Sequence, residues 1–149
     1  MLKRLRKLCG DERGMSFAFV GIGLMTFMAA TTLAIDVGMF MTARTQAQTS
    51  ADAGALSGVT ALVFNNWDNR TASGPAVQSA ISASQQNTVM GAAVSVQPTD
   101  VTFPNDSFGQ PNRVKVDVYR TAGRSNPVTT LLGSLLGHST IDIAATATA

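Results

Sequence analysis

The sequence is short of the residues on which most enzymes and disulfide-stabilised proteins depend. Its 149 residues include one cysteine and one histidine, and only 13% are charged, against roughly 25% in ordinary soluble domains. Cys9 cannot form an internal disulfide. Because basic residues rather than small apolar ones come before it, we interpret Cys9 as an inert thiol and not a lipidation site.

No catalytic constellation can be assembled from what remains. His138 follows Gly137 at the end of an expected short helix with no cysteine nearby, so we interpret it as a helix-end residue and not as a ligand or base. The carboxylates are scattered singly, and the nucleophile and haem motifs G-x-S-x-G, S-x-x-K and C-x-x-C-H do not occur. We therefore predict no catalytic, cofactor-binding or metal-binding residues, and no enzyme.

The basic residues gather in the first fourteen positions, where five basic and two acidic side chains give a net charge of +3. The rest of the chain sums to −1, so a pI of about 9.1 does not argue for a nucleic-acid partner. A later run carries Arg113, Lys115 and Arg120 in a strand pattern. It is either a basic binding strip or a solvated polar face, and we favour the polar face.

A stretch without charge runs from Met15 to Ile35. Twenty-one helical residues span about 31 Å, which matches the hydrocarbon core of a bilayer, whereas the apolar core of a signal peptide is usually about 7–15 residues long. We therefore favour a retained anchor over a cleaved signal. The positive-inside rule places the N-terminal tail in the cytoplasm and the remainder outside.

Small residues and one carboxylate mark this anchor. Gly21 and Gly23 would let a second helix approach closely, although glycine is common in any membrane helix, and both interpretations stay open. Asp36 falls near the outer membrane boundary. It either sits in the headgroup layer or is buried against a neighbouring subunit, and we favour the interfacial position.

The helical pattern continues past the lipid. Small or apolar residues recur at intervals of three or four, which predicts one helix from Ser16 to about Phe64. The stripe comprises Ala43, Ala47, Ala51, Ala55, Val59 and, at its end, Leu62 and Val63. We predict that it is a helix-packing surface, together with the two glycines of the anchor, and that the asparagine-rich stretch from Asn65 ends the helix.

The remaining residues predict a small α+β domain. Pro75 opens a second helix that could fold back on the first, and Pro127 opens a short amphipathic one. Alternation of apolar and polar residues predicts strands with one buried face. These strands contain Val94 and Val96, Val101 and Phe103, Val114, Val116 and Val118, and Ile141 and Ile143. The fold class is α+β with an antiparallel sheet.

We divide the chain into a basic cytoplasmic tail (1–14), a transmembrane segment (15–41), an extracytoplasmic continuation of the helix (42–66) and the small α+β domain (67–149).

The N-terminal third resembles the TadE/TadG-like proteins of the tight-adherence (Flp) pilus system. The resemblance rests on an arginine-glycine entry, a hydrophobic span, an Asp-x-Gly and a Q-x-x-x-D-A-x-A-L-x-G stretch. The matching positions are Arg13, Gly14, Asp36, Gly38, Gln48, Asp52, Ala53, Ala55, Leu56 and Gly58. The resemblance implies a pilin-like architecture and a bacterial cytoplasmic-membrane protein with an outer domain.

The same resemblance implies membrane lipid and other pilus-assembly proteins as partners, and it leaves two roles open. Pilin-like members are cleaved after a glycine, here between Gly14 and Met15, and carry glutamate at the fifth position of the product. Phe19 stands there instead, which favours an uncleaved, non-enzymatic assembly protein. The alternative is a subunit that forms a homo-oligomer or a cell-surface filament through its long helix.

Overall fold

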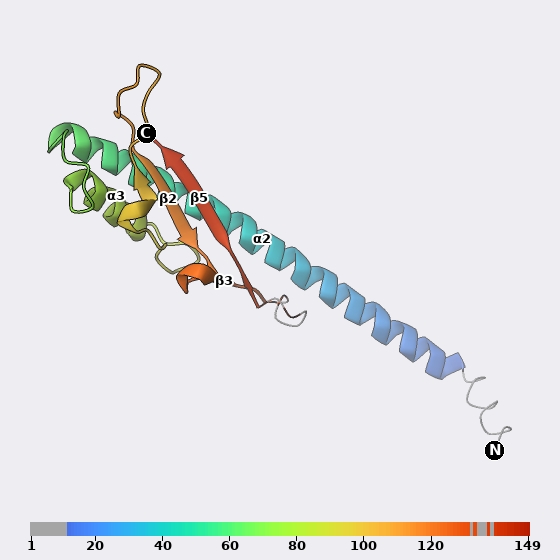
Figure 1. Ribbon diagram of the computed structural model, residues 1–149. Coiled ribbons are helices and arrows are strands. Elements are labelled where there is room, and N and C mark those ends of the chain that lie inside the picture. Colours follow the sequence, from blue (N-terminus) through green and yellow to red (C-terminus); the bar gives the residue numbers. More distant parts are fainter. Residues whose placement is uncertain (1–11, 132, 134–136, 138) are drawn as a thin grey trace.

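One long helix dominates the molecule. The computed structural model describes residues 12–131, 133, 137 and 139–149. Helix α2 (Glu12–Phe64) has 53 residues, about 80 Å at 1.5 Å per residue. Its N-terminal part projects away from the rest of the chain, and its C-terminal part is covered by the other elements (Figure 1). The predicted continuous helix is confirmed.

The asparagine-rich stretch ends α2 as expected. The Asn66 side-chain oxygen accepts hydrogen bonds from the N–H groups of Asp68 and Asn69, each at 3.1 Å, and this local turn competes with a further helical turn. Helix α3 (Pro75–Gln86) then begins with proline at its first position, where a missing N–H costs no helical bond. It folds back along α2 (Figure 1), as predicted.

The strands form two small antiparallel sheets. Strands β1 (Val101–Thr102), β2 (Lys115–Arg120) and β5 (Ile143–Thr148) lie in the order β1-β2-β5. In the second sheet, β3 (Val128–Thr129) pairs with β4 (Thr140–Ile141). Two short 3-10 helices, η1 (Pro98–Asp100) and η2 (Ala122–Arg124), complete the described elements. The predicted α+β class with an antiparallel sheet is confirmed.

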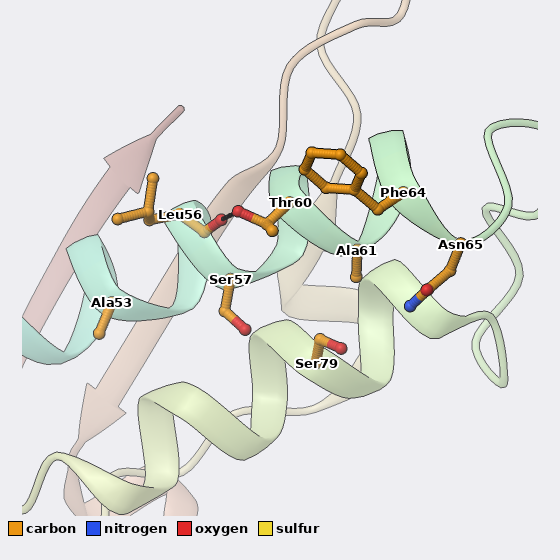
Figure 2. A pocket seen from close by; sticks show the side chains of 8 residues that line it. All are labelled: Ala53, Leu56, Ser57, Thr60, Ala61, Phe64, Asn65 and Ser79. Carbon is orange, nitrogen blue, oxygen red and sulfur yellow. Dashed lines mark hydrogen bonds between the residues drawn. The ribbon is translucent and has the colours of Figure 1, made fainter.

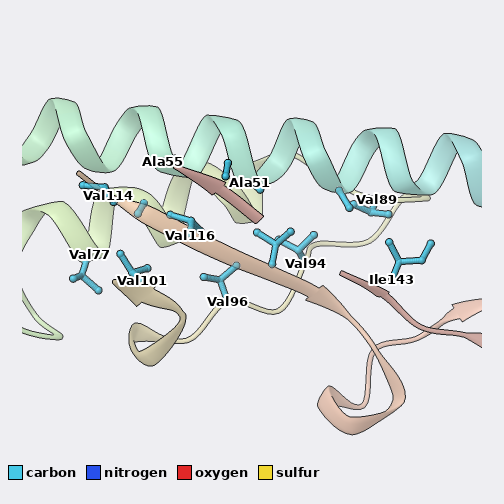
Figure 3. Packing of buried hydrophobic residues seen from close by; sticks show 14 of the residues in the cluster. Ala51, Ala55, Val77, Val89, Val94, Val96, Val101, Val114, Val116 and Ile143 are labelled. Carbon is cyan, nitrogen blue, oxygen red and sulfur yellow. The ribbon is translucent and has the colours of Figure 1, made fainter. Parts of the chain in front are cut away.

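The core lies between α2, α3 and the inner face of the three-stranded sheet. Alternate residues of β2 and the residue before it point toward α2, and the alanine stripe faces them (Figure 3). Alanine on one side and valine on the other let helix and sheet approach closely while burying a continuous apolar surface. Fully buried members include Ala43, Ala47, Ala51, Leu62, Val114, Val116 and Val118.

Two glycines of α2 make its crossing with α3 possible. A Cβ added at Gly58 would lie 2.8 Å from Cγ1 of Val114 and 3.1 Å from Cβ of Ala80. One added at Gly54 would lie 2.0 Å from the Ser84 hydroxyl oxygen. Carbon atoms in good contact are about 3.5–4.0 Å apart, so only glycine fits at these positions without a shift of the neighbouring chain.

One predicted strand did not form. Val94 and Val96 are buried, as the alternation suggested, but their segment pairs with β2 through a single bridge, between Ser95 and Tyr119, and not through a ladder. Pro98 follows closely and starts η1. Because proline has no N–H to donate, a ladder cannot continue through it.

The helix predicted from Pro127 is wrong at its start. Val128 and Thr129 form β3, and the carbonyl groups of Asn126 and Pro127 accept hydrogen bonds from the Arg120 guanidinium. Those two carbonyls are therefore not available to begin a helix. Leu132, Leu135, Leu136 and His138, which belonged to the same prediction, lie outside the described residues.

The boundary predicted between residues 66 and 67 does not separate two packed units. The C-terminal half of α2, from Ala43 to Leu62, belongs to the same core as α3 and the sheet. The predicted division into domains stays a prediction, to be tested with fragments of the chain.

Candidate functional site

The first feature of interest is the N-terminal half of α2 over residues 15–35, which the rest of the chain leaves uncovered and which we call the bare helix. Residues 15–35 are exposed except for the partly covered Thr32, and Phe17, for example, is 81% exposed. Among the described residues, one helix is long and apolar enough to cross a membrane, and no part of its most apolar window is buried inside the structure. An uncovered apolar surface of this length is unstable in water and stable in lipid.

Gly21 and Gly23 lie within this bare segment. No atom of another part of the chain comes within 4 Å of a Cβ added at either position. Both positions therefore remain accessible to a second helix, and their predicted role in helix packing stays a prediction.

Asp36 marks the place where the domain begins to cover the helix. It is only 3% exposed. Its two carboxylate oxygens accept hydrogen bonds from the N–H groups of Leu131, at 2.9 Å, and Gly133, at 3.3 Å. We expected Asp36 either in the headgroup layer or against a neighbouring subunit. The partners of these two hydrogen bonds lie within its own chain, 95 and 97 residues further along.

The alanine stripe has its packing partners inside the chain. Ala47 and Ala51 are fully buried and Ala55 is 1% exposed, beneath α3 and the sheet. A second copy could not reach these three side chains without displacing the domain. The part of the predicted helix-packing surface that they supply is thus an internal surface.

The polar positions of the Q-x-x-x-D-A-x-A-L-x-G stretch have distinct structural roles. Gln48 donates from its side-chain amide to Asp52, at 3.0 Å, and to the carbonyl of Thr146 in β5, at 3.2 Å. It therefore links α2 to the strand beside it, and Gly58 permits the approach of α3. Leu56, in contrast, is 63% exposed and has no role in the core.

Leu56 borders an open groove of about 500 Å³ between α2 and α3 (Figure 2). Phe64 lies at one end of the groove and is 81% exposed. The remaining lining consists of alanine, serine, threonine and asparagine side chains. Because no lining residue titrates near neutral pH, the groove can offer dispersion contacts and hydroxyl hydrogen bonds but no acid–base catalysis.

Arg120 is buried, whereas the sequence pattern predicted that it lies on a solvated polar face or in a basic binding strip. It is 6% exposed, and its guanidinium donates to the carbonyl oxygens of Val89, Ala92, Asn126 and Pro127. Burial lowers the pKa of Arg120 below its usual range. Lys115, on the other face of the strand, pairs with Asp117 at 3.3 Å, so these residues form neither a continuous basic strip nor a wholly solvated face.

The alternation of side chains along this strand could have predicted that Arg120 is buried. Residues 114, 116, 118 and 120 share one face of β2, and the first three are valines that line the core. A strand alternates its side chains strictly, so Arg120 had to point inward as well.

The other candidates add no reactive centre. Within the described residues, no group of three or more His, Cys, Asp or Glu side chains could hold a metal ion. Cys9 and His138 lie outside those residues. The peptide bond between Gly14 and Met15 lies inside α2, close to its first residue, and processing there stays a prediction.

Comparison with known proteins bears on the same part of the chain. Residues 14–61 match the family described as putative Flp pilus-assembly TadE/G-like proteins. No curated protein and no solved structure matches the chain. The match runs from the entry of the bare helix to the crossing with α3, and so contains the anchor, Asp36 and the alanine stripe. Residues 14–61 are therefore similar to TadE/G-like proteins, which confirms the resemblance and supports a pilus-related role.

Proposed function

We propose that this chain is a membrane-anchored, non-enzymatic component of tight-adherence pilus assembly. Its bare helix would cross the cytoplasmic membrane, its basic tail would lie in the cytoplasm, and the domain from Asp36 onward would lie outside. The observation that carries the proposal is the coincidence of two boundaries. The uncharged stretch ends at Ile35, and coverage of α2 by the domain begins at Asp36.

This coincidence supports the proposal because the two boundaries have independent causes. The length of the uncharged stretch reflects the thickness of a bilayer. Coverage by the domain depends on the packing of α3 and the sheet and on the contacts that Leu131 and Gly133 make with Asp36. A helix that served only as the core of a soluble domain would have no reason to leave 21 consecutive residues outside that core.

The topology can be tested with cysteine labelling in spheroplasts. The variant Phe108→Cys introduces a thiol in an exposed loop of the domain, and the native Cys9 serves as the cytoplasmic control. We expect a membrane-impermeant maleimide to label residue 108 before lysis and Cys9 only after it. Labelling of Cys9 in intact spheroplasts, or retention of the protein in the soluble fraction, would contradict the proposal.

A structural filament subunit is the second candidate, and the bare helix also favours it. A projecting apolar helix with Gly21 and Gly23 uncovered could pack against copies of itself in a filament core. Intact mass measurement separates the two roles. A full-length chain in the membrane fraction supports the assembly component, whereas a chain that begins at Met15 in sheared surface fibres supports the filament subunit.

A further inference from the structure

The membrane-proximal end of the domain is attached to α2 through a charged contact. Among the described residues, the N–H of Leu131 donates to one oxygen of Asp36 and the N–H of Gly133 donates to the other. These donors belong to the connection between β3 and β4. We call this contact, the Asp36 carboxylate with the two N–H groups, the Asp36 clasp.

The clasp is surrounded by exposed apolar side chains. Ile35 is 48% exposed, Val37 46%, Met41 66% and Leu131 55%. Val37 and Met41 are four residues apart and therefore share one face of the helix. The next charged side chain along α2 is Arg44, about 12 Å beyond Asp36 at 1.5 Å per residue. The apolar surface of the bare helix thus continues past the carboxylate and onto the domain.

A carboxylate at this depth requires partners, because burial without hydrogen bonds strongly disfavours the charged form. The clasp supplies donors to both oxygens and reduces the exposure of Asp36 to 3%. The helix can then sit deeper in the bilayer than its charge pattern alone suggests. Arg44, whose long side chain can reach the headgroups, marks the outer limit of this insertion.

We propose that the domain end formed by Leu131 and the Asp36 clasp rests in the interfacial layer of the bilayer, with Leu131 in contact with lipid. The partner is a lipid surface because Leu131 continues the apolar surface of the anchor. The clasp holds the segment there and fixes the orientation of the domain relative to the membrane. This inference rests on the proposed function, since it requires α2 to cross the membrane.

The test uses single-cysteine variants in a Cys9→Ser background, each labelled with bimane and reconstituted at one copy per lipid nanodisc. Three sites are compared: Leu131→Cys at the clasp, Met25→Cys in the middle of the anchor, and Phe108→Cys as the solvent reference. Phe108 is 86% exposed and belongs to the loop between β1 and β2, which projects from the end of the domain far from the N-terminus (Figure 1). Nitroxide groups on the lipid, at a shallow or a deep acyl position, quench nearby bimane.

We expect the shallow nitroxide to quench residue 131 at least threefold more than residue 108. The substitution Asp36→Asn replaces one accepting oxygen by an amide nitrogen, which can only donate, so it should lower quenching at residue 131 by half or more. Quenching at residue 25 should not change in that variant. Circular dichroism of the Asp36→Asn protein verifies that the domain remains folded.

Each contrary outcome has a distinct meaning. Equal quenching at residues 131 and 108 would overturn lipid contact, and shielding of residue 131 only at two copies per nanodisc would assign the surface to a second copy instead. Unchanged quenching at residue 131 in the Asp36→Asn variant would show that the Asp36 clasp does not hold residue 131 at the lipid. If the deep nitroxide does not quench bimane at residue 25, α2 does not cross the membrane, and the proposed function is contradicted as well.

Discussion

At the scale of single residues, the buried polar groups do more to define the structure than the exposed charges. Arg120 joins four carbonyl groups from two segments, those of Val89 and Ala92 in the turn after α3 and those of Asn126 and Pro127 before β3. A guanidinium presents five donors in a fixed plane, which suits a site where several backbone carbonyls converge. This residue holds irregular segments that no strand or helix would hold.

Replacement of Arg120 by methionine should therefore be costly. The change keeps an apolar stem but leaves buried carbonyls without donors, and we expect the free energy of unfolding to fall by about 2–4 kcal/mol. Urea titration in detergent, followed by the fluorescence of Trp67, measures it. Lys115→Met on the outer face is the control, since a surface ion pair contributes about 0–1 kcal/mol. Equal losses in both variants would contradict the role given to Arg120.

Asp106 should make the loop between β1 and β2 sensitive to acid. Its carboxylate accepts from the N–H groups of Gln110 and Phe108 and from the Asn112 amide. These bonds, that from Gln110 first, hold its pKa below the ordinary value of 3.8. Because the folded pKa is the lower one, the ordering is complete above pH 3.8 and is lost as the pH falls through the folded pKa. NMR titration should give a midpoint below 3.8, and Asp106→Asn should remove the transition; a midpoint at or above 3.8 would refute this account.

At the scale of elements, the two halves of α2 are built for different neighbours. The N-terminal half carries large apolar side chains on all sides, as a helix surrounded by lipid does. The C-terminal half carries alanine and glycine on the side facing α3 and the sheet. Small residues there allow the sheet to lie close to the helix axis.

Glycine-to-alanine changes should therefore have opposite effects in the two parts of α2. At Gly58 the new Cβ would overlap Val114, and we expect a loss of about 1–2 kcal/mol. At Gly38 nothing lies within 4 Å, so alanine should leave stability unchanged or raise it by up to about 1 kcal/mol through its helix propensity. Urea unfolding of both variants provides the measurement, and a stabilising Gly58→Ala would show that α3 does not pack as described.

At the scale of the whole molecule, the residues that form the apolar core predict which fragments of the chain can fold. A fragment of residues 37–149 keeps every member of the apolar core, whereas a fragment that starts at residue 67 loses the alanine stripe and Leu62. We expect the longer fragment to be folded in water, with a cooperative thermal transition by circular dichroism. The shorter one should lack dispersed amide proton shifts in NMR spectra, because one face of its sheet and of α3 would be bare. A folded shorter fragment would restore the boundary at residue 67.

Several features of this structure could be predicted from patterns along the sequence. The length of the uncharged stretch, the three-to-four spacing of small residues and the breaker sequence after Phe64 predicted α2 from end to end, since helices depend on local hydrogen bonds and helical periodicity. The TadE/G-like motif could be recognised for the same reason. None of these patterns says what a buried stripe packs against.

Tertiary packing decided the rest. It turned the alanine stripe into an internal surface, placed Arg120 under converging carbonyls, diverted residues 128–129 from a helix into β3, and covered Asp36 with a segment 95 residues away. Each of these outcomes depends on contacts between distant parts of the chain, whose free energies outweigh local preference. A pattern of spacing can show that a face is buried, but only the assembled fold shows which atoms cover it.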